Sequence, residues 1–371
     1  MSIEPFALER YFAKHEFSAR YLLSSSDCES LSMSDLVGMA DEETRQLWEG
    51  LKLGYTESSG HRLLREEIGA IYDGIEMHET LVAAPEEIIY LLMHALLKVS
   101  DHVICTFPGY QSLYEVARSI GCQVSCWEPD EEQDWHFDIE WLRGEIRADT
   151  KLLVVNFPHN PTGYLPTIDE YMAIIELARA RGIYLLSDEM YRFLEMEEGT
   201  TLPSACEHYR RAFSLFGMSK SFGLPGLRIG WMATRQGDIL EMMAGLKDYT
   251  TICSSAPSEI LAIIALRNRS RIVGEQLKRV RRNVDTLDIF FTEYKGMFSW
   301  NRPLGGSICF PRMLSVDDTY AFCTKLVQES GIMLAPSRIF DYGDQHVRIG
   351  FGREDLPDVL DRFGEYLDER F

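Results

Sequence analysis

The sequence predicts an α/β fold, with a mainly parallel central sheet in a large domain and a smaller α+β domain. The first observation is an alternation of apolar, strand-like runs with helical patterns from about Leu81, which is typical of parallel sheets built from βαβ units. The second is a change after about Ala256, where a long helical stretch precedes short strand-like runs. The third is the length of 371 residues, which favours about two domains.

The predicted elements follow one another through the middle of the chain. One helix is expected at 112–120 and another at 167–181, the latter opened by Thr167 as N-cap with Glu170 three residues later, and ended by Gly182. Buried strands are expected at 101–107, 123–127, 151–156, 183–187, 213–217 and 227–233.

The second domain is predicted from both ends of the chain. After Ala256 the pattern favours one helix over 258–295, followed by short strands at 307–310 and 346–351. The first fifty residues lack the βαβ rhythm, so we expect them to join this domain. The predicted division is a large domain of residues 51–256 and a small domain of residues 1–50 and 257–371.

Composition excludes several classes of partner. Lysine and arginine total 37 against 58 acidic residues, and the net charge of −21 disfavours attachment to nucleic acid or anionic membranes. The first twenty residues contain several charges and no uninterrupted apolar core, so no secretory signal is indicated and a cytoplasmic location is expected. Eight scattered cysteines have no paired metal spacing, so neither a metal site nor a disulfide framework is predicted.

The most informative stretch runs from Ser219 to Trp231 and reads Ser-Lys-Ser-Phe-Gly-Leu-Pro-Gly-Leu-Arg-Ile-Gly-Trp. It places Lys220 and Arg228 on one glycine-rich turn. A lysine amine can form a Schiff base with an aldehyde, and the planar fork of arginine can neutralise a phosphate. The pair therefore indicates the phosphorylated aldehyde pyridoxal 5'-phosphate. Most lysines are solvated surface charges and most such stretches are plain loops, so this interpretation depends on further residues.

Asp188 is the first of these further residues, because it directly follows the apolar run 183–187. The pyridoxal ring is a good electron sink only while its nitrogen is protonated and paired with a carboxylate. Aspartate at this kind of position is also a common helix N-cap. Tyr191 favours the cofactor, since its hydroxyl could donate to the phenolate oxygen of the ring. Asn160, in a turn stiffened by two prolines, is the second candidate donor.

With these residues the chain resembles the fold type I pyridoxal phosphate enzymes, specifically the class I/II aminotransferase family. The matching motifs are Asn-Pro-Thr-Gly at 160–163, Asp-x-x-Tyr at 188–191 and Ser-Lys-x-x-Gly-Leu-Pro-Gly-x-Arg at 219–228, in the order of the family. The resemblance runs from about Tyr55 to the C-terminus. It implies an aspartate aminotransferase-like fold with pyridoxal phosphate as cofactor.

The resemblance also implies roles for the residues of these motifs. Lys220 resembles the lysine that forms the Schiff base and then moves a proton between the substrate Cα and C4′ of the cofactor, and Asp188 resembles the partner of the ring nitrogen. Arg228 is similar to the main phosphate ligand of the family, to which Ser219 could add a hydroxyl. Gly217 stands where the family often has a further serine.

Residues outside these motifs complete the resemblance. Tyr110 resembles the aromatic residue that stacks on the cofactor ring, although a core tyrosine is the alternative. Tyr55 resembles the tyrosine that reaches the phosphate in the other subunit, which implies a homodimer. Family members often have Gly-Ser or Gly-Thr at the phosphate-binding turn, and here the N–H groups of Glu86 and Glu87 are expected to serve. Arg348 resembles the arginine that clamps the substrate α-carboxylate, with an exposed strand arginine as the alternative.

The predicted activity is transfer of the amino group of a free α-amino acid to a 2-oxo acid, with Asn160 and Arg348 binding the substrate. The carbanion that forms when the substrate Cα loses its proton also supports elimination, racemisation and cyclisation. The segment 22–29 lacks the Gly-Pro pattern frequent near the substrate carboxylate in this family, so a lyase or cyclase stays the alternative.

Three other classes of protein fit the sequence poorly. A nicotinamide-dependent dehydrogenase would need a G-x-G-x-x-G motif after a strand, and the sequence has none. A pyridoxal phosphate-dependent transcription regulator would need an added DNA-binding domain, for which the N-terminal segment is too short and too acidic. A catalytically silent binding protein is at odds with the presence of Lys220, Asp188 and Arg228 together. Side-chain specificity has no readable code in the sequence.

Overall fold

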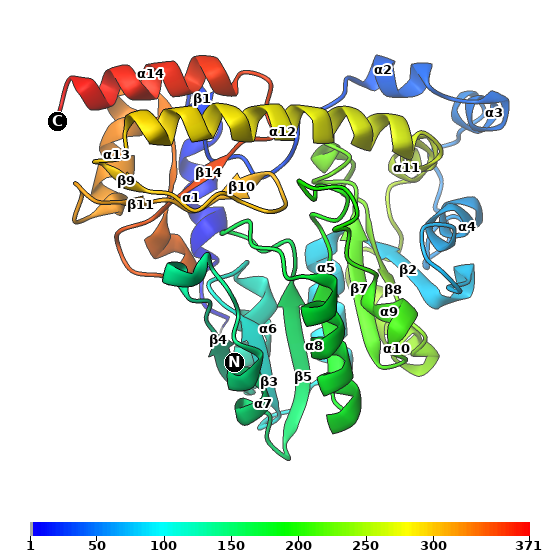
Figure 1. Ribbon diagram of the computed structural model, residues 1–371. Helices are drawn as coiled ribbons and strands as arrows, with labels where there is room; N and C mark the ends of the chain where they lie inside the picture. Colours follow the sequence, from blue (N-terminus) through cyan, green and yellow to red (C-terminus); the bar gives the residue numbers. More distant parts are fainter. Residues whose placement is uncertain (1–2) are drawn as a thin grey trace.

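A seven-stranded sheet forms the centre of the molecule in the computed structural model, which describes residues 3–371 (Figure 1). Met1 and Ser2, which the prediction placed in the small domain, lie outside the described residues. The strand order is β2-β8-β7-β6-β5-β3-β4, and β8 alone runs antiparallel to its neighbours. The strands are β2 (Thr80–Ala83), β3 (His102–Thr106), β4 (Gln123–Trp127), β5 (Thr150–Asn156), β6 (Tyr184–Asp188), β7 (Ala212–Gly217) and β8 (Gly230–Ala233).

Helices cover both faces of this sheet, which confirms the predicted α/β class. In β5, Leu152 and Val154 pack with the helices of one face, and Leu153 and Val155 pack with those of the other. Because both faces are buried, the strands read as continuous apolar runs rather than as alternating ones. One face carries α5 (Pro85–Leu96), α6 (Ser112–Ile120) and α10 (Gly237–Lys247), and the other carries α7 (Ile139–Glu145), α8 (Ile168–Arg181) and α9 (Ala205–His208).

Two predicted elements need correction. The strand expected over 227–233 begins only at Gly230, because a 3-10 turn precedes it and Arg228 has a left-handed φ of 54°. The helix expected over 258–295 is two helices, α11 (Ala256–Arg267) and α12 (Arg269–Glu293). Asn268 separates them, since its side-chain amide donates to the backbone oxygens of Ile264, at 2.8 Å, and Met39.

A second group of short strands and helices lies beyond the carboxyl ends of the parallel strands. In Figure 1, α12 crosses the molecule below α14. Segments from both ends of the chain meet here, because β1 pairs with β12 in parallel. The strands are β1 (Tyr21–Leu22), β9 (Phe298–Ser299), β10 (Ile308–Cys309), β11 (Arg312–Met313), β12 (Ile332–Met333), β13 (Ala335–Pro336) and β14 (Val347–Gly350), with helices α13 (Thr319–Ser330) and α14 (Leu356–Asp368).

The remaining helices belong to the N-terminal part of the chain. They are α1 (Ala7–His15), α2 (Met33–Gly38), α3 (Glu42–Glu49) and α4 (Arg62–Gly69). Short 3-10 turns occur along the chain at η1 (Met77–Glu79), η2 (Glu131–Gln133), η3 (Pro225–Leu227) and η4 (Ser337–Phe340). Leu36 of α2 and Leu64 of α4 share one apolar cluster with Leu261 of α11. The division into domains at residues 50 and 256 stays a prediction.

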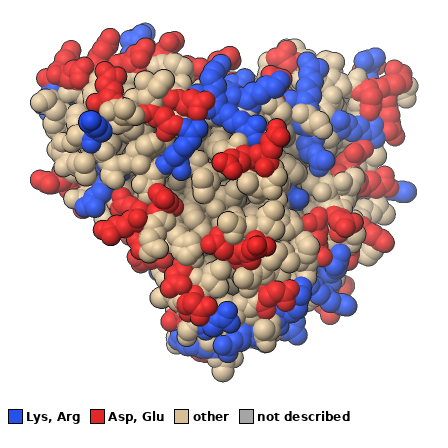
Figure 2. Space-filling view, in the orientation of Figure 1, with Lys and Arg blue, Asp and Glu red and all other residues tan. Residues whose placement is uncertain are grey.

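Charge is distributed unevenly over the surface. Figure 2 shows groups of acidic side chains dispersed over the visible face, with lysine and arginine gathered where α12 crosses it and again at the lower end of the view. The sequence of α12 contains Arg-Val-Arg-Arg at 279–282. Among residues 3–371, no helix is both long and apolar enough to cross a membrane.

Candidate active site

A cavity of about 880 Å³ lies where β5, β6 and the loop after β7 meet the N-terminal segment and β14. This is the edge at which open α/β sheets bind ligands. Nine of the eleven predicted site residues line it, and Tyr55 and Glu87 do not. The nine are Glu86, Tyr110, Asn160, Asp188, Tyr191, Ser219, Lys220, Arg228 and Arg348.

Asp188 and Asn160 are held together by the end of β5. Asn156, the last residue of β5, is the register partner of Asp188, the last residue of β6. The Asn156 side-chain amide donates to the backbone oxygen of Asp188 at 3.1 Å, and its side-chain oxygen accepts from the backbone N–H of Asn160 at 2.8 Å. One buried asparagine, which the prediction did not include, therefore fixes two motifs relative to one another.

The carboxylate of Asp188 is buried and lacks a cationic partner among the described residues. It accepts a hydrogen bond from the backbone N–H of Met190 at 3.1 Å. Burial raises the pKa of Asp188 to about 7, although that hydrogen bond and the charge of Lys220 act in the opposite direction. The alternative of a helix N-cap is wrong, because turns follow β6 and the next helix starts at Ala205.

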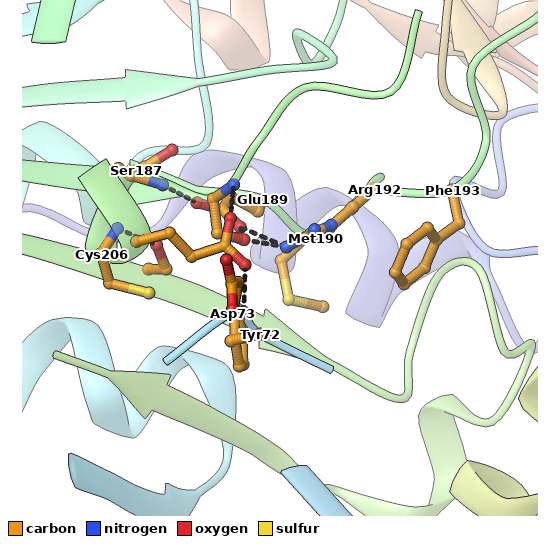
Figure 3. Close-up of polar contacts among 12 residues, drawn as sticks. Tyr72, Asp73, Ser187, Glu189, Met190, Arg192, Phe193 and Cys206 are labelled. Atoms are coloured by element: carbon orange, nitrogen blue, oxygen red, sulfur yellow. Dashed lines mark hydrogen bonds and ion pairs between the residues drawn. The ribbon is translucent and has the colours of Figure 1, made fainter. Parts of the chain in front are cut away.

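A buried polar network anchors the segment after Asp188. Glu189 pairs with Arg192 at 3.4 Å and accepts hydrogen bonds from the Ser204 hydroxyl at 2.5 Å and the Ala205 backbone N–H at 3.1 Å. Figure 3 shows Glu189 and Arg192 pointing toward one another, with Tyr72 beside them. Because each of these groups is buried with a partner, the network restrains the turn that carries Asp188 and Tyr191.

Lys220 lies in the loop that joins β7 to β8 and points into the cavity. Its Nζ donates to the Ser26 hydroxyl at 2.7 Å and lies 5.8 Å from the centre of the Tyr191 ring. The Tyr191 hydroxyl is buried and has no hydrogen-bond partner in the part of the chain that the structure describes. A buried hydroxyl of this kind requires a partner, and the cavity is where one can bind.

Arg228 lines the cavity and forms a half-exposed ion pair there. Its Nη2 lies 3.0 Å from Glu86 Oε2, and Glu86 Oε1 accepts from the Tyr110 hydroxyl at 3.0 Å. In α5 the first intrahelical backbone bond runs from Ile88 N–H to the oxygen of Ala84, so the N–H groups of the first turn are free for an anion. An arginine next to a helix N-terminus is a suitable place for a phosphate.

Glu87 and Tyr55 lie away from this mouth. The Glu87 carboxylate accepts a hydrogen bond from the Thr251 hydroxyl at 2.9 Å, so only its backbone N–H is available at the start of α5. Tyr55 is 89% exposed and lies in a loop fixed by a 2.8 Å hydrogen bond from the Thr56 hydroxyl to buried Glu259. Neither side chain is brought to the cavity within one chain.

Arg348 of β14 is 1% exposed, so the alternative of an exposed strand arginine is wrong. Nη2 donates to the backbone oxygen of Ser24 at 2.9 Å, and Nη1 lies 3.3 Å from the side-chain oxygen of Asn160. Nε has no partner among the described residues, and burial lowers the pKa of this guanidinium. The guanidinium lies 5.6 Å from the Phe12 ring centre.

The N-terminal segment approaches β14 at a position that only glycine can occupy. A Cβ on Gly350 would lie 1.7 Å from the backbone oxygen of Ser25. The backbone N–H of the same glycine donates to the backbone oxygen of Leu23 at 2.9 Å. This contact brings Ser26 to Lys220 across 194 residues of sequence. Other residues that line the cavity and that sequence reasoning missed include Glu9, Phe12, Glu16, Asp27 and Asn156.

Close packing of two strands explains why position 217 is a glycine. It is the register partner of Gly230, and a Cβ there would lie 2.9 Å from the Gly230 Cα and 3.0 Å from the Ile229 oxygen. The two strands approach too closely for the serine that the family often has at this position. The hydroxyl of Ser219, which lines the cavity, is the nearer candidate for a phosphate contact.

Comparison with known proteins agrees with this geometry. Residues 22–363 match the family Aminotransferase class I and II. Capreomycidine synthase of Streptomyces vinaceus is 28% identical, over 97% of this chain and 93% of that protein. Aspartate aminotransferase of Sulfolobus acidocaldarius is 24% identical, over 88% of this chain and 86% of that protein.

Solved structures give the same result at the level of the fold. A PLP-dependent aminotransferase from Streptococcus suis superposes with a TM-score of 0.92 and 30% identity, covering 100% of this chain and 99% of that one. The PLP-dependent cyclase OrfR superposes with a TM-score of 0.91 and 25% identity, with the same coverage. The fold and the cavity are those of a pyridoxal phosphate-dependent enzyme of fold type I. The chain belongs to the aminotransferase class I and II family.

Proposed function

We propose that the protein is an aminotransferase that moves the amino group of a free α-amino acid to a 2-oxo acid. The observation that carries this proposal is the arrangement of Lys220, Asp188 and Arg348 around one cavity. A nucleophilic amine, a buried carboxylate and a buried guanidinium are the three groups needed to bond an aldehyde cofactor, hold its ring charge and bind a carboxylate.

The residues of the cavity fit pyridoxal phosphate. Asp188, whose raised pKa reflects an unpartnered buried carboxylate, would pair with the ring nitrogen, and the unpaired Tyr191 hydroxyl would donate to the ring oxygen together with Asn160. Arg228, Ser219 and the amides at the start of α5 would hold the phosphate. When bound, the cofactor supplies an electron sink for the charge that develops at the substrate Cα.

The other residues of the cavity would bind the substrate and move its proton. Arg348 would bind the α-carboxylate through its fork, held in place by the Ser24 backbone oxygen. Lys220 would take the proton from the substrate Cα and deliver it to C4′ of the cofactor. The Ser26 hydroxyl accepts a 2.7 Å hydrogen bond from the Lys220 amine and so fixes the position of that amine.

A lyase or cyclase is the second candidate, because specific relatives favour it. Capreomycidine synthase is 28% identical over nearly the whole chain, and the cyclase OrfR superposes almost as closely as the Streptococcus suis aminotransferase does. The N-terminal segment that carries Ser26 also lacks the family's Gly-Pro pattern. Both reactions begin by removal of the same proton, so Lys220 would have the same first role in either.

We also propose that the active unit is a homodimer. Leu53, Tyr55 and Tyr249 are 88%, 89% and 91% exposed. The buried Lys247 amine donates to the backbone oxygen of Ser58 at 2.7 Å, which restrains the loop that carries Tyr55. Exposed aromatic and aliphatic groups on restrained loops are typical of surfaces that a partner covers. Such a surface would let Tyr55 reach the cofactor phosphate of the second copy.

The decisive experiment mixes holoenzyme with single amino acids in the absence of any oxo acid acceptor. Transamination predicts one equivalent of 2-oxo acid per site, with conversion of the cofactor to its amine form. A lyase would release ammonia and oxo acid over many turnovers, and a cyclase would return a cyclic amino acid. Lys220→Ala should abolish borohydride-dependent attachment of the cofactor to the protein, and attachment to another lysine would contradict the assignment.

A further inference from the structure

Helix α1 presents an acidic face to the cavity. Glu9, Phe12 and Glu16 all line it, and their spacing of three and four residues places them on one side of the helix. Phe12 lies against the guanidinium of Arg348. The two carboxylates therefore lie to either side of a ring that covers the group proposed to bind the substrate α-carboxylate.

The basic residues of the cavity already have partners or roles. Among the described residues that line it, only Lys220, Arg228 and Arg348 are lysine or arginine. Arg228 and Lys220 are assigned to the cofactor in the proposed function, and Arg348 to the α-carboxylate. The cavity therefore has no remaining basic group for a second carboxylate on the substrate, such as the one in aspartate or glutamate.

Acidic groups, by contrast, are in excess. Asp27 lines the cavity but pairs with Arg353 at 2.7 Å. Glu9 accepts one hydrogen bond, from the Tyr110 hydroxyl at 3.0 Å, and forms no ion pair within residues 3–371. Glu16 is only half-exposed and has neither an ion pair nor a side-chain hydrogen bond in that part of the chain. Burial together with the charges of Asp27 and Glu9 raises the pKa of Glu16, which places these carboxylates near one another.

The group proposed to bind the α-carboxylate is marked independently of these acidic residues. Arg348 is 1% exposed, lines the cavity, and keeps Nε without a partner among the described residues. A buried guanidinium with an unused donor is suited to bind an anionic ligand. An amino acid bound there by its carboxylate extends its side chain into a cavity whose lining carboxylates without an ion pair or an assigned role, among residues 3–371, are Glu9, Glu16 and the exposed Glu4.

We infer that the substrate is an amino acid whose side chain ends in a cationic ammonium or guanidinium group, bound by Glu9 of α1 and by Glu16, the residue directly after this helix. This inference rests on the proposed function, because it takes Arg348 as the site of the α-carboxylate. A neutral side chain would leave the half-buried Glu16 carboxylate without a partner, and an anionic side chain would be repelled by both carboxylates.

The first test compares arginine with citrulline, which has the same length and a neutral ureido group in place of the guanidinium. With holoenzyme, the concentration that gives half-maximal change of the cofactor absorbance should be about 10- to 100-fold lower for arginine, the range expected for one or two hydrogen bonds between charged groups. Lysine should resemble arginine, and glutamate should bind more weakly than citrulline. Equal values for arginine and citrulline would overturn the inference.

Variants locate the effect on α1. Glu16→Gln should weaken arginine binding about 10-fold or more and leave citrulline binding within about twofold of wild type, because only the charge is removed. Glu9→Gln should act in the same direction, with an added effect through Tyr110. Glu49→Gln removes an exposed carboxylate at the end of α3 and is the matched control. An equal loss for both amino acids in Glu16→Gln would mean that Glu16 is structural, and would refute its proposed role.

A probe that cannot react separates this inference from the proposed function. 5-Guanidinopentanoate is arginine without its α-amino group, and it should compete with arginine about 10-fold or more better than 5-ureidopentanoate does. If arginine and this probe bind selectively but the cofactor never reaches its amine form, transamination fails while the specificity stands. If several neutral amino acids are transaminated as readily as arginine and the probe shows no preference, the specificity fails while transamination stands.

Discussion

Asp188 makes the stability of the cofactor-free protein depend on pH. Its pKa is raised from 3.8 to about 7 because the folded chain buries the carboxyl group. The protonated form is therefore favoured in the folded state. Its contribution to the unfolding free energy is fully present below about pH 4, and it is lost as the pH rises through 7. Multiplying the difference, 7 − 3.8, by about 1.4 kcal/mol per pH unit gives a total loss of about 4 kcal/mol.

The perturbation that isolates this effect is Asp188→Asn, which keeps the shape and removes the titration. In cofactor-free protein, the unfolding free energy of the asparagine variant minus that of wild type should grow by about 3 kcal/mol between pH 5 and pH 8. Urea unfolding at several pH values measures this difference, and taking it cancels the other groups that titrate. Bound cofactor should restore most of the loss in wild type, because its ring nitrogen pairs with the carboxylate.

Parallel pH profiles of the unfolding free energy in wild type and Asp188→Asn would refute this reasoning. If wild type and Asp188→Asn change together with pH, the carboxyl group ionises in the folded protein as easily as in the unfolded one. If the cofactor stabilises wild type no more at pH 8 than at pH 5, its ring nitrogen is not the partner of Asp188.

Three further substitutions test the phosphate and carboxylate contacts and the packing of the sheet. Arg348→Lys keeps the charge but loses the fork, so kcat/KM should fall about 10- to 100-fold for every amino acid, with cofactor affinity unchanged in a fluorescence titration. Glu86→Gln frees Arg228 from a half-exposed ion pair and should tighten cofactor binding about two- to fivefold, and weaker binding would contradict the phosphate role. Gly217→Ser should lower the unfolding free energy by about 1–3 kcal/mol, because its Cβ meets the backbone of β8. Gly245→Ser, with open space at the Cβ, is the matched control and should leave the thermal midpoint nearly unchanged.

The parts of the fold and site that sequence reasoning could predict depend on local patterns. The strands of the sheet were predictable because both faces are buried, and Lys220 and Asp188 because each follows a strand within a few residues. Ser26 and Asn156 were not, since their contacts depend on how distant segments meet. The same holds for Asn268, whose bond to the Met39 oxygen helps to end α11 in what reads as a continuous helical pattern.

The acidic face of α1 was missed for a different reason. Glu9 and Glu16 were visible in the sequence, but in a chain with 58 acidic residues a solvated surface position was the simpler interpretation. Only the placement of α1 over the cavity distinguishes them from other acidic side chains. The small side chain of Gly217 was noted as a departure from the family, and the close approach of Gly230 explains it.

The contact between Ser25 and Gly350 has a consequence for biosynthesis. Residues 21–22 find their strand partner only at 332–333, and Arg348 joins them later still. A ribosome that has translated the seven-stranded sheet, which ends at Ala233, has thus translated every residue proposed to hold the ring and phosphate of the cofactor. The Arg348 site for the substrate carboxylate and the contact of Ser26 with Lys220 can form only after almost the whole of the remaining chain has been translated. A nascent chain stalled near residue 300 could therefore present a cofactor site before it has any means of selecting an amino acid.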